Sequence, residues 1–116
     1  MSKKILVVLE QRDNKLKRTA SEVSTVANNI ASKLGYESEA IVLGSEVENL
    51  SAVQSFGLKK IVHYKNSSLT NYSSSAYTDL ISGYAKETGA EYILLSNTSL
   101  GKDLAPLISV RLNAGI

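Results

Sequence analysis

The sequence predicts an α/β fold, a parallel sheet with helices on both faces, and two observations carry the prediction. Four short apolar runs rich in Val, Ile and Leu alternate with stretches in which apolar residues recur at helical spacing. Alternating strand and helix patterns are typical of βα units, which build parallel sheets through right-handed crossovers. At 116 residues the chain fits one domain, and its 43% of hydrophobic and 21% of charged residues are ordinary for a globular protein.

The first predicted unit is a strand at residues 5–9 followed by a helix at residues 19–35. The run ILVVL suits a strand that is buried on both faces of a parallel sheet. Thr19 with Glu22 three positions later predicts a capping box, and Gly35 supplies the stop. One face of this helix is expected to be apolar: Ala20, Val23, Val26, Ala27, Ile30, Ala31 and Leu34.

The second predicted unit repeats this plan in a shorter form. Residues 39–43 predict a strand. Ser45 and Glu48 have the spacing of another capping box, which would open a short helix. This helix is expected to end at Phe56 and Gly57.

The third unit joins a strand at residues 60–64 to a serine-rich segment. The spacing of its apolar residues predicts a helix at residues 72–88 with a polar outer face. The residues that recur at three and four positions are Ala76, Tyr77, Leu80, Ile81, Tyr84 and Ala85.

The fourth unit is a strand at residues 92–95 and a helix at about residues 101–113. Pro106 is expected in the first turn of this helix, because proline has no N–H group for an interior hydrogen bond. Two residues, Ser99 and Asp103, are both candidates for the N-cap.

Composition excludes several classes of function. The chain has no cysteine, which excludes disulfides and thiolate metal sites, and no apolar run approaches the ~18 residues of a membrane span. Residues 1–18 carry six Lys or Arg residues, but no aromatic residue accompanies Lys15, Lys17 and Arg18. We therefore expect a solvated or partner-facing loop there, and no nucleic-acid interface.

Two polar segments follow the first and the fourth strand, and they form the candidate site. If these strands are neighbours, EQRDNK at residues 10–15 faces SNTSLGK at residues 96–102, beyond the carboxyl ends where ligands of α/β sheets bind. The second segment matches neither the P-loop nor the GxGxxG pattern. It suits either a capped helix start or an anion site at a helix N-terminus. The weak anion-loop candidates are Thr98, Ser99, Gly101 and Lys102.

Other polar residues have structural interpretations. His63 has no Ser, Asp or metal-ligand partner at a recognisable spacing, so we expect a structural role. Glu10 and Arg12 could orient a ligand or a partner, but a simple loop ion pair is favoured. The six tyrosines are expected mostly on core faces. No catalytic residue or metal site is predicted.

Three segments resemble a known family: ILVVLEQRDNKLKRTASEV, AIVLGSEVE and LLSNTSLGKDLAPLISVRLNAG. They are similar to the amino-terminal domain of the electron transfer flavoprotein alpha subunit, the family that includes FixB-type proteins. The resemblance runs nearly end to end, and its most specific part follows the family pattern T-S-L-G-[RK]-D-L-A-P. The matching residues are Thr98, Ser99, Leu100, Gly101, Lys102, Asp103, Leu104, Ala105 and Pro106.

The resemblance implies a Rossmann-like domain of the adenine nucleotide alpha hydrolase type, truncated before its last strand or strands. Residues 1–116 would be an amino-terminal domain that is incomplete at its carboxy end. The family's FAD-binding domain would be absent, so no bound cofactor is expected in this chain. The related beta subunit binds AMP, whereas the alpha domain docks against it without binding nucleotide.

The implied function is that of a scaffold and docking module, not of an enzyme. The module belongs to a cytoplasmic, prokaryotic heterodimer that carries electrons from acyl-CoA or other flavin dehydrogenases through FAD. The implied partner is the beta subunit. The alternative is a stand-alone module that binds a small ligand or an adenine nucleotide, which the same fold supports.

Overall fold

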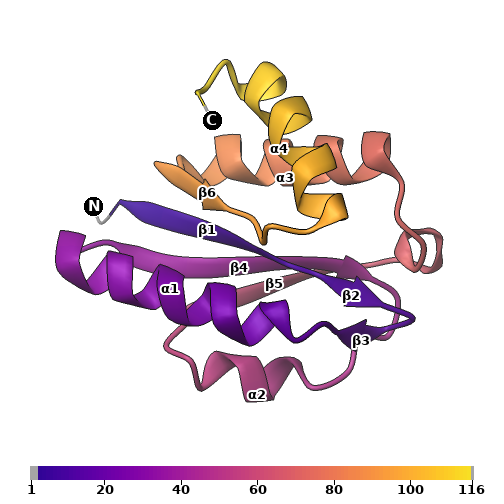
Figure 1. Ribbon diagram of the computed structural model, residues 1–116, viewed down its shortest axis with the longest axis horizontal. Helices are drawn as coiled ribbons and strands as arrows, with labels where there is room; N and C mark the ends of the chain where they lie inside the picture. Colours follow the sequence, from indigo (N-terminus) through magenta and orange to yellow (C-terminus); the bar gives the residue numbers. More distant parts are fainter. Residues whose placement is uncertain (1–2, 116) are drawn as a thin grey trace.

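Four parallel strands form one sheet in the computed structural model, which describes residues 3–115. The strand order is β5-β4-β1-β6 (Figure 1). The bounds are Lys4–Leu9 for β1, Glu37–Gly44 for β4, Lys60–Lys65 for β5 and Tyr92–Leu94 for β6. Val7 of β1 pairs with Ala40 of β4 on one side and with Leu94 of β6 on the other. The predicted α/β class is confirmed, and the first and fourth predicted strands are neighbours.

Helices cover both faces of the sheet (Figure 1). On one face lie α1 (Thr19–Leu34) and α2 (Leu50–Gln54), and on the other lie α3 (Ser74–Thr88) and α4 (Ser99–Leu112). A single 3-10 turn, η1 (Ser67–Leu69), precedes α3. No helix within the described residues is long and apolar enough to cross a bilayer.

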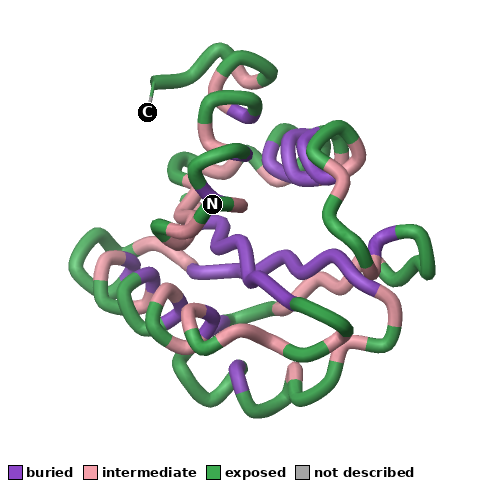
Figure 2. The backbone as a smooth tube through the Cα atoms, turned by 45° about the vertical axis from the view of Figure 1, so that its right-hand side comes forward, coloured by how far each residue is buried: buried purple, intermediate pink, exposed green. Residues whose placement is uncertain are grey.

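The central strands divide their side chains between two hydrophobic cores, because successive strand residues point to opposite faces. Ile5, Val7 and Leu9 pack under α1 and α2, whereas Leu6 and Val8 pack under α3 and α4. All five are at most 3% exposed, and Figure 2 shows the buried backbone concentrated in the middle of the sheet. This double burial explains why the sequence shows a continuous apolar run here.

The polar segment after β1 is a short hairpin, not the open loop that the sequence predicted. Antiparallel pairing joins β2 (Gln11–Arg12) to β3 (Lys15–Leu16). The two turn residues, Asp13 and Asn14, have φ angles of 53° and 66°. Asp and Asn tolerate this left-handed region better than other non-glycine residues, so the turn chemistry is present in the sequence.

Neither predicted capping box forms. Thr19 lies inside α1, its Oγ1 is buried without a partner, and Arg18 at the N-cap makes no side-chain hydrogen bond to the helix. The helix continues from the hairpin, since the Ala20 amide donates to the Lys17 carbonyl at 2.9 Å. Gly35, with φ at 71°, ends the helix as predicted.

The second capping box does not form because the two backbone amides that it needs donate to the hairpin residue Asn14 instead. The Ser45 amide donates to Asn14 Oδ1 at 3.1 Å, and the Glu48 amide donates to the Asn14 carbonyl at 2.9 Å. The helix α2 starts only after Asn49, and it ends at Gln54, before the predicted stop.

The apolar face of α1 is narrower than its sequence pattern indicates. Val26 and Leu34 are 50% and 48% exposed, so these two predictions were wrong. Ser24 is fully buried instead, and its hydroxyl donates to the Ala20 carbonyl at 2.6 Å. A back-bonded serine is small enough to let the helix approach the sheet closely.

Candidate functional site

The candidate site lies at the carboxyl ends of β1 and β6, where the strand order reverses direction. From β1 the sheet extends through β4 to β5 on one side and to β6 on the other. The chain leaves β1 into the hairpin and leaves β6 into the start of α4 (Figure 1). In α/β sheets this switch point is the usual place for a ligand.

A buried carboxylate closes this switch point. Glu10, directly after β1, is 3% exposed, and its Oε2 accepts a hydrogen bond from Thr98 Oγ1 at 2.6 Å. Its Oε1 accepts from Lys17 Nζ at 3.2 Å. The predicted ion pair between Glu10 and Arg12 was therefore wrong, because the hairpin leaves Arg12 exposed and brings Lys17 to the carboxylate.

Thr98 is the N-cap of α4. Its hydroxyl oxygen accepts a hydrogen bond from the Gly101 amide at 3.1 Å while its proton is donated to Glu10. Neither Ser99 nor Asp103, the two predicted caps, has this role. The Thr98 hydroxyl thus connects the Glu10 carboxylate to the first turn of α4. The helix dipole stabilises a carboxylate in this position.

Because α4 begins at Ser99, Pro106 lies inside the helix and not in its first turn. The prediction assumed that a proline marks a helix start, since an interior proline removes a hydrogen bond. Asp103, two residues into the predicted helix, accepts a hydrogen bond from the hydroxyl of Tyr72. This bond ties α4 to the segment in front of α3.

Gly101 is required by packing. A Cβ atom at this position would lie 2.0 Å from the carbonyl oxygen of Ser96, far inside van der Waals contact. Only glycine lets the helix start approach the end of β6 this closely. Of the other anion-loop candidates, Ser99 and Lys102 are exposed, and Lys102 is in none of the ion pairs found within residues 3–115.

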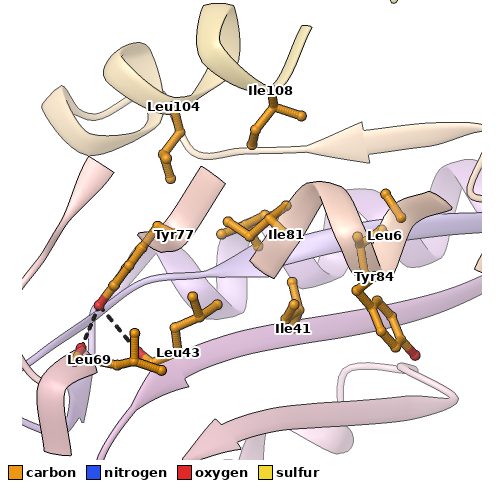
Figure 3. Packing of buried hydrophobic residues seen from close by; sticks show 11 residues of the cluster. Leu6, Ile41, Leu43, Leu69, Tyr77, Ile81, Tyr84, Leu104 and Ile108 are labelled. Atoms are coloured by element: carbon orange, nitrogen blue, oxygen red, sulfur yellow. Dashed lines mark hydrogen bonds between the residues drawn. The ribbon is translucent and has the colours of Figure 1, made fainter. Parts of the chain in front are cut away.

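Gln11 and Tyr77 form a second buried contact at the same edge, which sequence reasoning missed. Gln11 Nε2 lies within hydrogen-bond distance of the Leu69 and Thr70 carbonyls and of the Tyr77 hydroxyl. Tyr77 in turn donates to the Leu69 carbonyl at 2.7 Å, and Figure 3 shows its ring among the core residues. Burial raises the pKa of Tyr77. The only sequence signal was the helical spacing that placed Tyr77 on a core face.

A similar carboxylate lies toward the amino ends of the strands. Glu39 is 4% exposed, and it accepts hydrogen bonds from Tyr84 at 2.8 Å and from Lys4 at 2.9 Å. Burial acts to raise the pKa of Glu39, but the hydrogen bonds from Lys4 and Tyr84 outweigh it, so that the pKa lies below its ordinary value. The hydrogen bond to Glu39 raises the pKa of Lys4, and burial raises that of Tyr84.

The remaining polar and aromatic candidates do not assemble into a reactive site. His63 lies half-buried on β5, and its Nε2 has no hydrogen-bond partner. No group of three potential metal ligands occurs within the described residues. Tyr77 and Tyr84 are buried as predicted, but Tyr72 and Tyr92 are 39% and 52% exposed.

Known proteins match this chain in sequence over nearly its whole length. The family described as the Electron transfer flavoprotein domain matches residues 5–116. The chain is 40% identical over 115 residues to the electron transfer flavoprotein subunit alpha of Thermoanaerobacterium thermosaccharolyticum, which covers 98% of this chain and 35% of that protein. It is 32% identical over 114 residues to Protein FixB of Clostridium saccharobutylicum, with 98% and 34% covered. The chain therefore spans about a third of the length of these relatives.

A solved structure supports the fold independently. The universal stress protein from Archaeoglobus fulgidus superimposes with a TM-score of 0.64 and covers 98% of this chain and 96% of its own. Sequence identity is 15%, so the likeness is one of fold alone. It confirms the predicted parallel sheet flanked by helices.

Proposed function

Because the chain belongs to the electron transfer flavoprotein family, we propose that it is the amino-terminal domain of an alpha-type subunit. One of the relatives it matches is an electron transfer flavoprotein subunit alpha. We assign the domain the role of scaffold and docking module in a heterodimer that carries electrons from flavin dehydrogenases through FAD. Its partner would be the beta subunit, its compartment a prokaryotic cytoplasm, and the domain itself would have no catalytic role.

The buried Glu10 carboxylate and Thr98 already fill the switch point between β1 and β6. This observation favours docking over nucleotide binding. A phosphate at the start of α4 would meet the carboxylate of Glu10, and the Gly101 amide already donates to Thr98. Glu10 already pairs with Lys17 and accepts from Thr98, so a phosphate here would have to displace the carboxylate from both partners. The residues present at this edge therefore do not fit the pyrophosphate of FAD, and we place the FAD-binding site in another domain of the complete subunit.

The edge of β6 supports the proposal that the domain continues beyond this chain. β6 pairs only with β1, so one side of the strand carries no partner within the described residues. A groove of about 510 Å³ lies beside it, between β6, α3 and α4, and includes Ile93, Ile108 and Leu112. Open strand edges are normally paired or covered. We propose that a further strand of the complete domain pairs with β6 here.

Binding measurements on the purified chain test this function. We expect it to be colourless and to bind FAD no more tightly than about 1 mM, roughly 4 kcal/mol of binding free energy. The beta subunit from the same genome should bind it weakly or moderately in surface plasmon resonance. Stoichiometric yellow flavin that survives gel filtration contradicts the assignment of FAD to another domain.

Thermal melts with AMP test the alternative of a nucleotide-binding module. We expect the melting temperature to be the same with and without AMP, since a ligand stabilises a protein only by binding its folded state. A clear rise with AMP, lost in Lys102→Ala, would instead support an anion site at the start of α4.

A further inference from the structure

A second groove, of about 510 Å³, lies between β3, the start of α1, and α2. Its apolar residues are Leu16, Ala20, Ala52, Val53 and Phe56. Val53 and Ala20 are 6% and 2% exposed, whereas Phe56 is 40% exposed. A large, partly exposed aromatic ring beside a buried apolar surface is typical of an anchor point for a partner.

The two sides of this groove are held together by Asn14. Its backbone carbonyl accepts from the Glu48 amide at 2.9 Å, and its Oδ1 accepts from the Ser45 amide at 3.1 Å. Gln11 Oε1 accepts from the Asn14 amide at 2.9 Å and so connects the hairpin turn to the buried contact with Tyr77. The hairpin therefore cannot swing away from α2 without breaking these bonds. A preformed groove loses little conformational freedom when a partner binds.

Exposed positive charge lies on one side of the groove, where Lys15 lines it and Arg12 and Arg18 are close in sequence. Arg12, Lys15 and Arg18 are exposed, and none of them takes part in the ion pairs found between residues 3 and 115. The positive charge of Lys17, by contrast, is balanced by Glu10. The exposed carboxylates nearby are those of Asp13, Glu22 and Glu48, and Glu48 itself lines the groove.

We propose that this groove binds an acidic segment of the beta-type partner subunit. An apolar side chain of that segment packs against Phe56 and Leu16, and its carboxylates face Arg12, Lys15 and Arg18. The surface deepens the docking role proposed above and rests on it. Its charges accelerate the encounter with the partner, and the apolar contact sets the lifetime of the complex.

Surface plasmon resonance with the beta subunit from the same genome tests the surface. We expect the double variant Lys15→Glu and Arg18→Glu to associate about tenfold more slowly at low salt, with a smaller difference at high salt. Lys17 is left unchanged because it pairs with Glu10. Phe56→Ser should accelerate dissociation about tenfold or more, as loss of an aromatic anchor does.

Two matched variants control for nonspecific effects. Lys33→Glu reverses an exposed charge near the other end of α1, and Val110→Ser removes an apolar side chain that is 83% exposed on α4. Both should bind the beta subunit as the unaltered chain does. If the groove variants behave like these controls, the beta subunit binds elsewhere and the groove proposal is wrong.

A synthetic acidic peptide with one central phenylalanine separates failure of the groove from failure of the proposed function. We expect it to shift the amide resonances of Leu16, Val53 and Phe56 in the ¹⁵N-labelled chain. The same peptide with Gln and Asn in place of Glu and Asp should shift them much less. Peptide binding without beta-subunit binding keeps the groove as a site for acidic segments but overturns the partner and the proposed heterodimer. Loss of both overturns groove and partner together.

Discussion

Two buried carboxylates lie at opposite ends of the sheet, and each is held by the same kinds of partner, one lysine and one hydroxyl. The carboxyl-edge centre consists of Glu10, Lys17 and Thr98, and the amino-edge centre consists of Glu39, Lys4 and Tyr84. Each carboxylate is nearly inaccessible, each accepts from one lysine, and each accepts from one hydroxyl. The chemistry is alike, but the surroundings differ.

The difference is in what the hydroxyl is attached to. Tyr84 projects from the middle of α3, so the amino-edge centre joins a helix face to the sheet. Thr98 is the N-cap of α4, so the carboxyl-edge centre joins the first turn of α4 to the end of β1. The amino-edge centre thus contributes to packing, whereas the carboxyl-edge centre, with the same kinds of group, fills a potential ligand position. Buried polar clusters acquire functional meaning from their place in the fold, not from their composition.

The largest expected effect concerns the support of the carboxyl-edge centre. Gly101→Ala should lower the free energy of unfolding by about 3 kcal/mol, because its Cβ would collide with the backbone carbonyl of Ser96. Gly83→Ala is the matched control, since Gly83 lies in α3 with nothing within 4 Å of a new Cβ. It should raise stability by about 0.5 to 1 kcal/mol. Urea denaturation of both variants decides; equal effects would show that Gly101 has no special contact.

The amino-edge centre should respond to pH. The pKa of Glu39 is below its ordinary value of 4.5 in the folded protein, so its ionised form stabilises the fold. This stabilisation is complete above pH 4.5 and is lost as the pH falls through the lower, folded pKa. Glu39→Gln should therefore reduce stability by about 1 to 2 kcal/mol at neutral pH and flatten the acid limb of the stability curve.

Denaturation curves measured from neutral pH into the acid range check this prediction. Tyr84→Phe is a useful companion variant, because it removes one hydrogen bond to Glu39 and keeps the ion pair with Lys4. Its acid limb should be intermediate. An acid limb in Glu39→Gln as steep as in the unaltered chain would mean that other carboxylates cause the acid sensitivity.

Removal of the cap should have a moderate effect at the carboxyl edge. Thr98→Ala should cost about 1 to 2 kcal/mol, since both the Gly101 amide and the Glu10 carboxylate lose a partner. Thr98→Ser keeps the hydroxyl and should recover most of this loss. Thermal melts of these variants beside Ser99→Ala, which should be nearly neutral, identify the cap; a larger loss in the Ser99 variant would reject Thr98.

The smallest effect is expected at Lys102. This side chain is exposed, so Lys102→Ala should change the free energy of unfolding by less than about 0.5 kcal/mol. A melting experiment in phosphate buffer and in a buffer without multivalent anions checks it. Stabilisation by phosphate that depends on Lys102 would mean that the carboxyl-edge centre opens to anions.

The strands were predictable because their signal is strong and local. A run such as Ile5 to Leu9 is apolar at every position only if both faces are buried. The N-terminal helix caps were not predictable, since a capping box is a weak four-residue pattern. The Ser45 amide donates to the Asn14 side chain instead. These two residues are far apart in the sequence, so no local sequence pattern predicts the contact.

The site was predictable in place but not in its contacts. The sequence brings residues 10–15 and 96–102 to one edge as soon as β1 and β6 are neighbours, which the structure confirms. The turn at Asp13 and Asn14 has a sequence signal, but that signal does not show that the turn directs Lys17 toward Glu10. Long-range partners depend on tertiary geometry, which propensity and spacing do not encode.

Pro106 divides α4 into two blocks, and we expect them to exchange hydrogen with solvent at different rates. A proline at this position cannot donate to the Lys102 carbonyl, so the ladder of hydrogen bonds is interrupted in the middle of the helix. The block before it is anchored to β1 through Thr98 and Glu10, whereas Val110 in the block after it is 83% exposed. The carboxy-terminal turns can therefore open without disturbing the amides of the first turn. Slow exchange at Gly101 beside fast exchange at Val110 is the expected signature of this division.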